Sequence, residues 1–347
     1  MNKFLKAIAV VVVLVMALAV ILPIQEQPVA AQGDLGSEDN PIQVYFVPSG
    51  DAEVIVSGGE LVAQALEAAT GLNYEVFVPT SYAATIEAMC AAPGGSMGFI
   101  PAAGYVVANN RCGVEVEAAA VRFGRAFYWA QYIVRRDSDI YTFGDLEGRS
   151  WAYGDPTSTS GFIVPSVELG AAGITPGDQV ETGGHGQTVL AVYNGEADFG
   201  TTFFSPPLVP GSQWEVGDLP EPYDLTVDES FIGEDGNLWV GEVRVLDARA
   251  SVRETAPDVI DQIRILRISE AIPNDTLSFG PDFPEELRTQ IVDALIAYSG
   301  TDEWVESLGN PDFYEWSTLQ PIEDDAFDSV RLQMQVLGQS EEDILGE

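Results

Sequence analysis

The stretch that decides the fold is Gly154-Asp155-Pro156-Thr157-Ser158-Thr159-Ser160-Gly161. A short apolar segment before it, residues 150–153, predicts a strand, and Phe162-Ile163-Val164 after it opens a helical pattern that ends near Gly173. The hydroxyl groups are therefore expected at a helix start, where backbone N–H groups lack intrahelical acceptors and the helix dipole is positive. This arrangement favours binding of an anion.

The same stretch has a simpler interpretation as a helix cap or a turn. A cap needs only one hydroxyl, whereas this stretch supplies Ser158, Thr159 and Ser160 in succession. Capping and turn chemistry are nevertheless common roles for serine and threonine. From these residues alone, both interpretations stay open.

The stretch resembles the signature of a known family, the substrate-binding proteins of ABC importers for phosphate, phosphonate and phosphite. The family's Asp-Pro-x-Ser-Thr-Ser-Gly corresponds to residues 155–161, and the match continues to Pro165. Further matching blocks follow the family's order at residues 79–84, 128–129, 133–138, 184–192, 194–198 and 272–275. Together these blocks cover most of residues 41–300.

The resemblance implies an α/β chain with a two-lobed periplasmic-binding-protein type II fold, a ligand cleft between the lobes, and closure of the lobes on the ligand. The regular alternation of predicted strands and helices agrees with an α/β fold. The predicted division is a signal peptide over 1–31, a linker over 32–40, one lobe over 41–131 plus about 272–347, and a second lobe over about 132–271 that includes an acidic insertion at 205–253.

The proposed insertion is rich in proline and carboxylates. A solvated surface flap is the favoured interpretation, and a docking surface for a partner is the alternative. After it, helical spacing is predicted at Val259, Ile263 and Leu266, and again over residues 287–295.

The N-terminal segment has the pattern of a signal peptide. Lys3 and Lys6 precede an apolar run over residues 7–22, and Val29-Ala30-Ala31 suits cleavage before Gln32. We therefore expect export to the periplasm or the outer face of the membrane. Because the apolar run is long, an uncleaved signal anchor is the alternative. The cleavage region contains no cysteine, so the sequence gives no support for a lipid anchor.

The net charge limits which partners are possible, and the cysteines bear on the redox compartment. The formal net charge is -39, which argues against nucleic acid and acidic membrane surfaces as partners. Salt screens charges beyond about 8 Å, so donors inside a pocket decide whether a small anion binds. For Cys90 and Cys112, a disulfide is favoured in an oxidising compartment, with two buried thiols as the alternative.

The resemblance also implies a set of ligand-binding residues: Tyr82, Tyr128, Ser158, Thr159, Ser160, His185 and Asp275. Their hydroxyls would donate to phosphoryl oxygens, and the imidazolium of His185, the only histidine, would add a charge-assisted hydrogen bond. Asp275 would accept a proton from a ligand hydroxyl or ammonium, or orient a donor. Without the resemblance, such tyrosines are more typical of a core, and such a histidine of an exposed loop.

One difference from the family's binding site narrows the range of candidate ligands. Its aminophosphonate receptors carry a second acid just after the strand that corresponds to residues 197–202, and this chain has Ser205 there. The departure weighs against an amino-bearing phosphonate and favours phosphate, phosphite or a small alkylphosphonate.

The predicted function is a binding protein that captures a small phosphorus oxyanion for the permease of an ABC importer, with no cofactor and no metal. The Gly-x-Ser-x-Gly pattern at residues 94–98 leads into a predicted strand, whereas a nucleophile elbow leads from a strand into a helix, and a lone histidine excludes His-rich zinc motifs. One alternative is an exported hydrolase that uses Ser158 or Ser160 with His185. Another is a ligand-sensing component that acts without transport.

Overall fold

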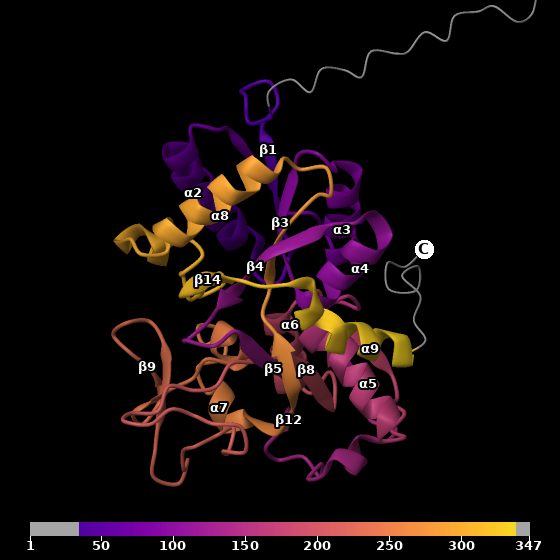
Figure 1. Cartoon of the computed structure of the whole chain (residues 1–347). Helices are drawn as coiled ribbons and strands as arrows, with labels where there is room; N and C mark the ends of the chain where they lie inside the picture. Colours follow the sequence, from indigo (N-terminus) through magenta and orange to yellow (C-terminus); the bar gives the residue numbers. More distant parts are fainter. Residues whose placement is uncertain (1–34, 338–347) are drawn as a thin grey trace, which may run out of the picture.

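Two mixed β-sheets form the centres of two lobes in the computed structural model, which describes residues 35–337 (Figure 1). The upper sheet in this view has the order β14-β4-β13-β3-β1-β2. Its strands are β1 (Ile42–Phe46), β2 (Tyr74–Phe77), β3 (Ser96–Ile100), β4 (Glu115–Val121), β13 (Thr276–Phe279) and β14 (Thr318–Pro321). Its helices are α2 (Ala52–Thr70), α3 (Tyr82–Ala91), α4 (Ala102–Cys112) and α8 (Glu285–Tyr298).

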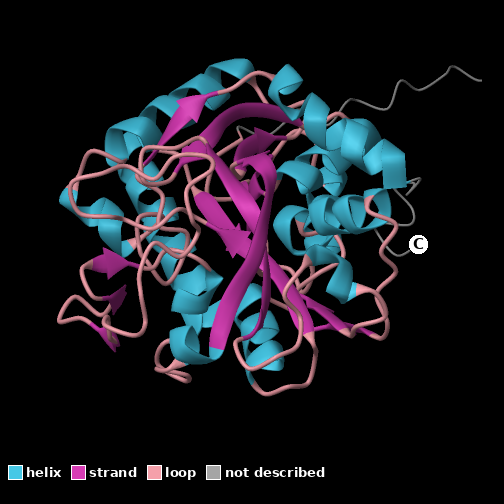
Figure 2. Ribbon diagram, turned by 90° about the horizontal axis from the view of Figure 1, so that it is seen from below, coloured by secondary structure: helices cyan, strands magenta, loops and turns pink. Residues whose placement is uncertain are grey.

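The lower sheet has the order β12-β5-β8-β6-β7. Its strands are β5 (Phe127–Arg135), β6 (Trp151–Tyr153), β7 (Gln179–Glu181), β8 (Phe199–Phe204) and β12 (Ile263–Pro273). The helices of this lobe include α5 (Val164–Ala171), α6 (His185–Tyr193) and α7 (Val259–Gln262). Seen from below, helices surround the strands on both sides (Figure 2). The predicted α/β two-lobed fold is thus confirmed, while the residue limits predicted for the lobes stay predictions.

Local sequence signals explain where the first elements begin and end. The side chain of Asp51 accepts hydrogen bonds from two backbone N–H groups at the start of α2, and Gly71 ends that helix in the left-handed conformation with φ 73°. Ser81 caps α3 by accepting from the N–H of Ala84 at 3.1 Å. The predicted disulfide is confirmed, since Cys90 and Cys112 join the ends of α3 and α4.

The helix predicted through Val259, Ile263 and Leu266 is wrong beyond its first turn. Helix α7 ends at Gln262, and Ile263 begins β12, which pairs antiparallel with β5. Ile263 and Ile265 are both buried, a spacing of two that places them on one face of a strand. The pairing with a buried neighbour outweighs a weak helical spacing in a segment rich in β-branched residues.

The insertion at 205–253 is only partly a solvated flap. It forms a small antiparallel sheet of β9 (Ser230–Ile232), β10 (Leu238–Val240) and β11 (Val243–Arg244). Trp214 is 2 % exposed and its ring lies 5.3 Å from that of Trp129 on β5, whereas Val216 remains 75 % exposed. The flap interpretation is therefore wrong for the apolar residues that pack against the lower sheet, because their burial offsets the cost of ordering this segment.

The chain passes between the two lobes at two neighbouring crossings. One follows β4 at residues 122–126, and the other joins β12 to β13 at Asn274 and Asp275. The side-chain amide of Asn274, which is 1 % exposed, donates to the carbonyls of Ala120 and Arg125, each at 2.9 Å. This amide therefore holds the two crossings together.

The predicted signal peptide lies outside the described residues. Within residues 35–337, no helix combines the length and the apolarity needed to cross a membrane.

Candidate functional site

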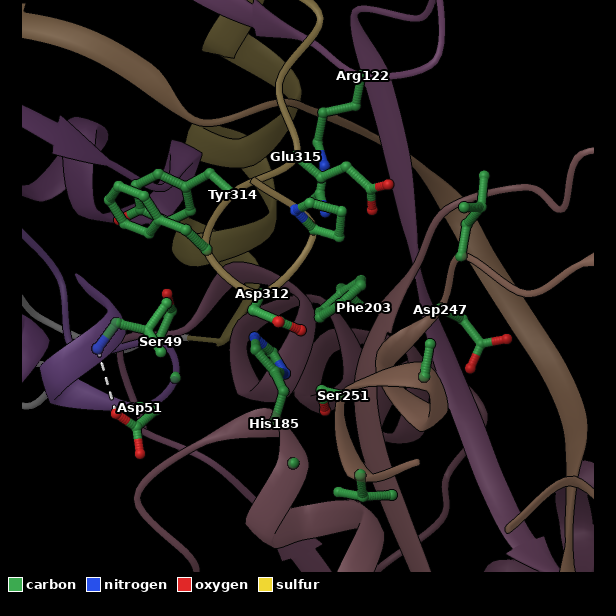
Figure 3. Close-up of a pocket in the computed structure, with 18 of the residues that line it drawn as sticks. Ser49, Asp51, Arg122, His185, Phe203, Asp247, Ser251, Asp312, Tyr314 and Glu315 are labelled. Atoms are coloured by element: carbon green, nitrogen blue, oxygen red, sulfur yellow. Dashed lines mark hydrogen bonds between the residues drawn. The ribbon is translucent and has the colours of Figure 1, made fainter. Parts of the chain in front are cut away.

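A cavity of about 510 Å³ lies beside the two crossings and receives side chains from both lobes (Figure 3). Among the predicted site residues, those that line it are Tyr82, Tyr128, Ser158, Ser160, His185 and Asp275. Thr159 is fully buried, and its hydroxyl oxygen accepts a hydrogen bond from the N–H of Ala103 on α4 at 2.8 Å. The structure therefore gathers the predicted residues around one cavity, with Thr159 behind its wall as a contact to the other lobe.

The motif forms the helix start that the sequence predicts. A π-helical turn over Thr159–Ile163 leads into α5, and the side chain of Ser158 accepts from the N–H of Gly161 at 3.1 Å. Single π-turns at helix ends are frequent at functional sites. The hydroxyl hydrogen of Ser158 is still available for donation, because only its oxygen is used as an acceptor in this contact.

Two glycines allow the close approach of chain segments around the motif. A Cβ on Gly161 would lie 2.9 Å from Oγ of Ser158 and 3.6 Å from the His185 ring. A Cβ on Gly154 would lie 3.1 Å from the backbone of Gly184, which precedes α6. Side chains at these positions would therefore push the serine, the histidine and the loop before α6 apart.

The two tyrosines come from opposite lobes, Tyr82 from the start of α3 and Tyr128 from β5. Both are buried, and burial raises the pKa of each phenol well above its ordinary value. Nearby carboxylates raise these pKa values further, while hydrogen bonds with Ser160 and Thr159 act in the opposite direction on Tyr128. Both phenols are therefore protonated at neutral pH and able to donate to an anion.

His185 is the first residue of α6 and is 9 % exposed. Burial, together with the positive charge of Arg122, lowers the pKa of its imidazole to about 4. In this structure the ring is therefore neutral near pH 7, whereas the sequence predicts an imidazolium. Within the described part of the chain, its buried Nδ1 atom has no hydrogen-bond partner. Among residues 35–337, no carboxylate is hydrogen-bonded to this atom, as the alternative of a serine–histidine relay in a hydrolase would require.

Asp275 occupies the second crossing and faces the same cavity. Burial raises the pKa of its carboxyl above the ordinary value, and the charge of Arg122 opposes this rise. A carboxyl poised in this way can exchange a proton with a hydroxylated oxyanion more readily than an exposed aspartate can.

The position at which the family can carry a second acid is occupied by a buried serine. Ser205 follows β8, is 2 % exposed and does not line the cavity. Carboxylates reach the cavity from other segments, namely Asp51, Asp247, Glu254, Asp275, Asp312 and Glu315. Ser205 therefore contributes no acid to the cavity, and the preference for phosphate, phosphite or a small alkylphosphonate over an amino-bearing phosphonate stays a prediction.

The far wall of the cavity was not predicted and consists of ion pairs between the lobes. Arg244 of the insertion pairs with Glu315, and the Nη2 atom of Arg253 lies 2.6 Å from Oδ1 of Asp312. Asp312 and Glu315 belong to the loop before β14 in the upper lobe. Sequence reasoning could not find these pairs, because each joins residues about 60 to 70 positions apart without a shared motif.

Arg122 is another lining residue that sequence reasoning missed. It lies at the first crossing, with its guanidinium carbon 5.2 Å from the centre of the Phe203 ring. The sequence prediction placed this residue inside the first lobe, at 41–131, so it gave no signal that Arg122 lies where the chain crosses between the lobes.

No group of three or more histidine, cysteine, aspartate or glutamate side chains within residues 35–337 is arranged to hold a metal ion.

The chain matches one protein family over most of its length. A family model described as "ABC transporter, phosphonate, periplasmic substrate-binding protein" matches residues 44–327. The chain is 24% identical over 243 residues to the phosphate-import protein PhnD of Mycolicibacterium smegmatis, covering 66% of this chain and 72% of that protein. It is 25% identical over 275 residues to the phosphonates-binding periplasmic protein of Escherichia coli, covering 75% and 67%.

Solved structures show the same fold. The binding-protein component of an ABC phosphonate transporter from Pseudomonas aeruginosa superposes with a TM-score of 0.62 at 19% identity, covering 86% of each chain. PhnD1 from Prochlorococcus marinus, solved in complex with methylphosphonate, gives a TM-score of 0.63 at 13% identity and covers 86% of this chain and 98% of its own.

Proposed function

Because this chain belongs to the family of periplasmic substrate-binding proteins of phosphonate ABC transporters, we propose that it captures phosphate, phosphite or a small phosphonate and delivers it to the permease of an importer. The family consists of binding proteins and not of enzymes. Family membership also implies export, in line with the predicted signal peptide.

The observation that carries this proposal is the set of neutral donors around the cavity. The hydroxyls of Tyr82, Tyr128, Ser158 and Ser160 come from both lobes and face one space. Hydrogen bonds to an anion are stronger than those to a neutral acceptor, and each donor from a different lobe adds to the free energy of closure. The relatives agree with this ligand class, since one is named for phosphate import and another was solved with methylphosphonate.

Asp275 provides a reason for selectivity against sulfate. A phosphorus oxyanion can carry a proton near neutral pH, and that P–OH group can donate to the carboxylate. Sulfate has no such proton, so one of its acceptor oxygens would face the carboxylate of Asp275, which is also an acceptor. Leaving two negatively charged oxygens face to face costs free energy and discriminates against the wrong anion.

The test is isothermal titration of residues 32–347 with phosphate, phosphite, methylphosphonate and 2-aminoethylphosphonate, with sulfate as the control. We expect a dissociation constant in the micromolar range or below, about -8 kcal/mol or stronger, for at least one phosphorus ligand and none for sulfate. The absence of binding to all four phosphorus ligands would contradict the proposal.

A further inference from the structure

Two ion pairs join charged side chains that line the cavity. Of the three lining arginines, Arg244 pairs with Glu315 and Arg253 with Asp312. Among the described residues, Arg122 makes no ion pair with a carboxylate, and its Nε atom is buried without a hydrogen-bond partner. A buried, unpaired donor on a charged group is costly and needs a compensating acceptor.

The geometry points to Arg122 as the principal cation that holds the ligand's phosphoryl group, an assignment that rests on the proposed function. Figure 3 shows Arg122 reaching into the cavity near Glu315, with Phe203 and His185 around the same opening. The Phe203 face, 5.2 Å from the guanidinium carbon, fixes the plane of the guanidinium while leaving its N–H edge free. A planar guanidinium presents two parallel donors that match two oxygens of a phosphoryl group.

The pKa values of two neighbouring groups indicate that these groups and the Arg122 guanidinium share one space. The charge of Arg122 lowers the pKa of His185 and opposes the rise in the pKa of Asp275. The imidazole is neutral near pH 7, so it cannot supply the fixed positive charge that a dianion needs. The guanidinium of Arg122 is the group that supplies this positive charge.

The position of Arg122 couples binding to lobe closure. It follows β4 at the first crossing, and the adjoining segment is held to the second crossing by Asn274. An anion that contacts Arg122 is therefore bound at the point about which the lobes move. Serines 158 and 160 of the lower lobe can then reach the same anion as the lobes close.

The test compares wild-type residues 32–347 with Arg122→Gln, Arg122→Lys and the matched control Arg125→Gln, each titrated with methylphosphonate and with inorganic phosphate. Arg125 lies on the same crossing but donates to the carbonyl of Trp214 and does not line the cavity. We expect Arg122→Gln to weaken binding about 10- to 100-fold, Arg122→Lys to restore part of the loss, and Arg125→Gln to change it by less than about threefold.

A second readout separates a contact from a structural effect. Wild-type affinity should fall as salt is raised, and this dependence should be weaker in Arg122→Gln and unchanged in Arg125→Gln. Because the chain has a single histidine, its imidazole NMR signals report the cavity directly, and the pKa of His185 should rise in Arg122→Gln. If Arg122→Gln does not fold, the lysine variant carries the same comparison.

The outcomes distinguish this assignment from the proposed function. Phosphorus ligands that bind wild type and Arg122→Gln with equal affinity would overturn the role of Arg122 and leave the function intact. Equal losses in Arg122→Gln and Arg125→Gln would also overturn it, since they would indicate a general charge effect. A wild-type protein that binds none of the phosphorus ligands would overturn both.

Discussion

The two walls of the cavity solve different problems with different chemistry. The hydroxyl wall, made by Tyr82, Tyr128, Ser158 and Ser160, presents neutral donors that are still able to donate. The ion-pair wall, made by the Arg244–Glu315 and Arg253–Asp312 pairs, presents charges that already satisfy one another. Because its charges are already paired, the ion-pair wall is suited to joining the lobes. The hydroxyl wall still has donors to offer and is suited to binding an anion.

A buried charge network centred on Arg249 lies in the sequence between the two arginines of the ion-pair wall. Arg249 is 1% exposed and donates to both oxygens of Asp247 at 2.9 Å and to Glu221 at 2.6 Å. Replacing it with leucine would leave the buried Asp247 unpaired, so we expect a loss of about 3–5 kcal/mol in the free energy of unfolding. Urea denaturation would measure this effect.

The matched control for that change is Arg149→Leu, which removes an exposed pair with Asp139. We expect this control to cost about 0–1 kcal/mol. Equal losses in Arg249→Leu and Arg149→Leu would show that the buried network contributes no more to stability than an exposed ion pair.

The hydroxyl wall should respond in affinity and not in stability. Ser160→Ala removes one lining donor, and we expect methylphosphonate to bind more weakly by about 1.5–3 kcal/mol, because a charged acceptor loses a partner. Ser166→Ala is the control, since Ser166 is on α5 but does not line the cavity. Titration calorimetry that gives the same affinity for both variants would remove Ser160 from the site.

His185, which lies beside the hydroxyl wall, should make the free energy of unfolding of the protein sensitive to acid. Its pKa is about 4 in the fold against an ordinary 6.5, so the unfolded chain binds more protons between these values. Stability from this group is therefore complete above pH 6.5 and is lost as the pH falls toward 4, by about 2 kcal/mol between pH 7 and pH 5. Asp275, with its raised pKa, acts in the opposite direction.

Denaturation of wild type and His185→Gln at pH 7 and pH 5 isolates the histidine from Asp275, which both proteins share. The variant should lose less stability on acidification than wild type does. An identical loss in the two proteins would mean that His185 titrates normally in the fold.

The smallest expected effect is the coupling energy between Arg244 and Glu315, the ion pair that joins the two lobes. Both side chains of the Arg244–Glu315 pair are 15% exposed, so a double-mutant cycle with Arg244→Gln and Glu315→Gln should give a coupling of about 1 kcal/mol in ligand affinity. The exposed Arg331–Asp328 pair on α9 (Asp328–Leu337) is the control. A coupling no larger than that of the control would show that the ion-pair wall does not contribute to closure.

The family resemblance implied the residues of the hydroxyl wall, and the helix start at its two serines could be predicted because that information is local. The signature at residues 155–161 is contiguous, its caps act over three or four positions, and Gly71 and Ser81 mark helix ends by their own conformational preferences. The two-lobed fold followed from the matching blocks and from the alternation of strands and helices.

What could not be predicted depends on contacts between distant segments. The partners of Arg244 and Arg253 are fixed only when the insertion folds onto the loop before β14. The strand at Ile263 was mistaken for a helix because its antiparallel neighbour, β5, lies far away in the sequence. The protonation of His185 also escaped prediction, because it depends on burial and on the charge of Arg122.

The order of strands in the upper sheet has a consequence for the synthesis of this chain. Strand β13 lies between β4 and β3, so β4 has no neighbour from the N-terminal segment until residues 276–279 have been made. The lower sheet uses one continuous stretch, from β5 to β12, whose ends pair with each other at Phe127 and Pro273. The lower lobe can therefore fold as a unit during synthesis, before strands β13 and β14 of the upper lobe have been made.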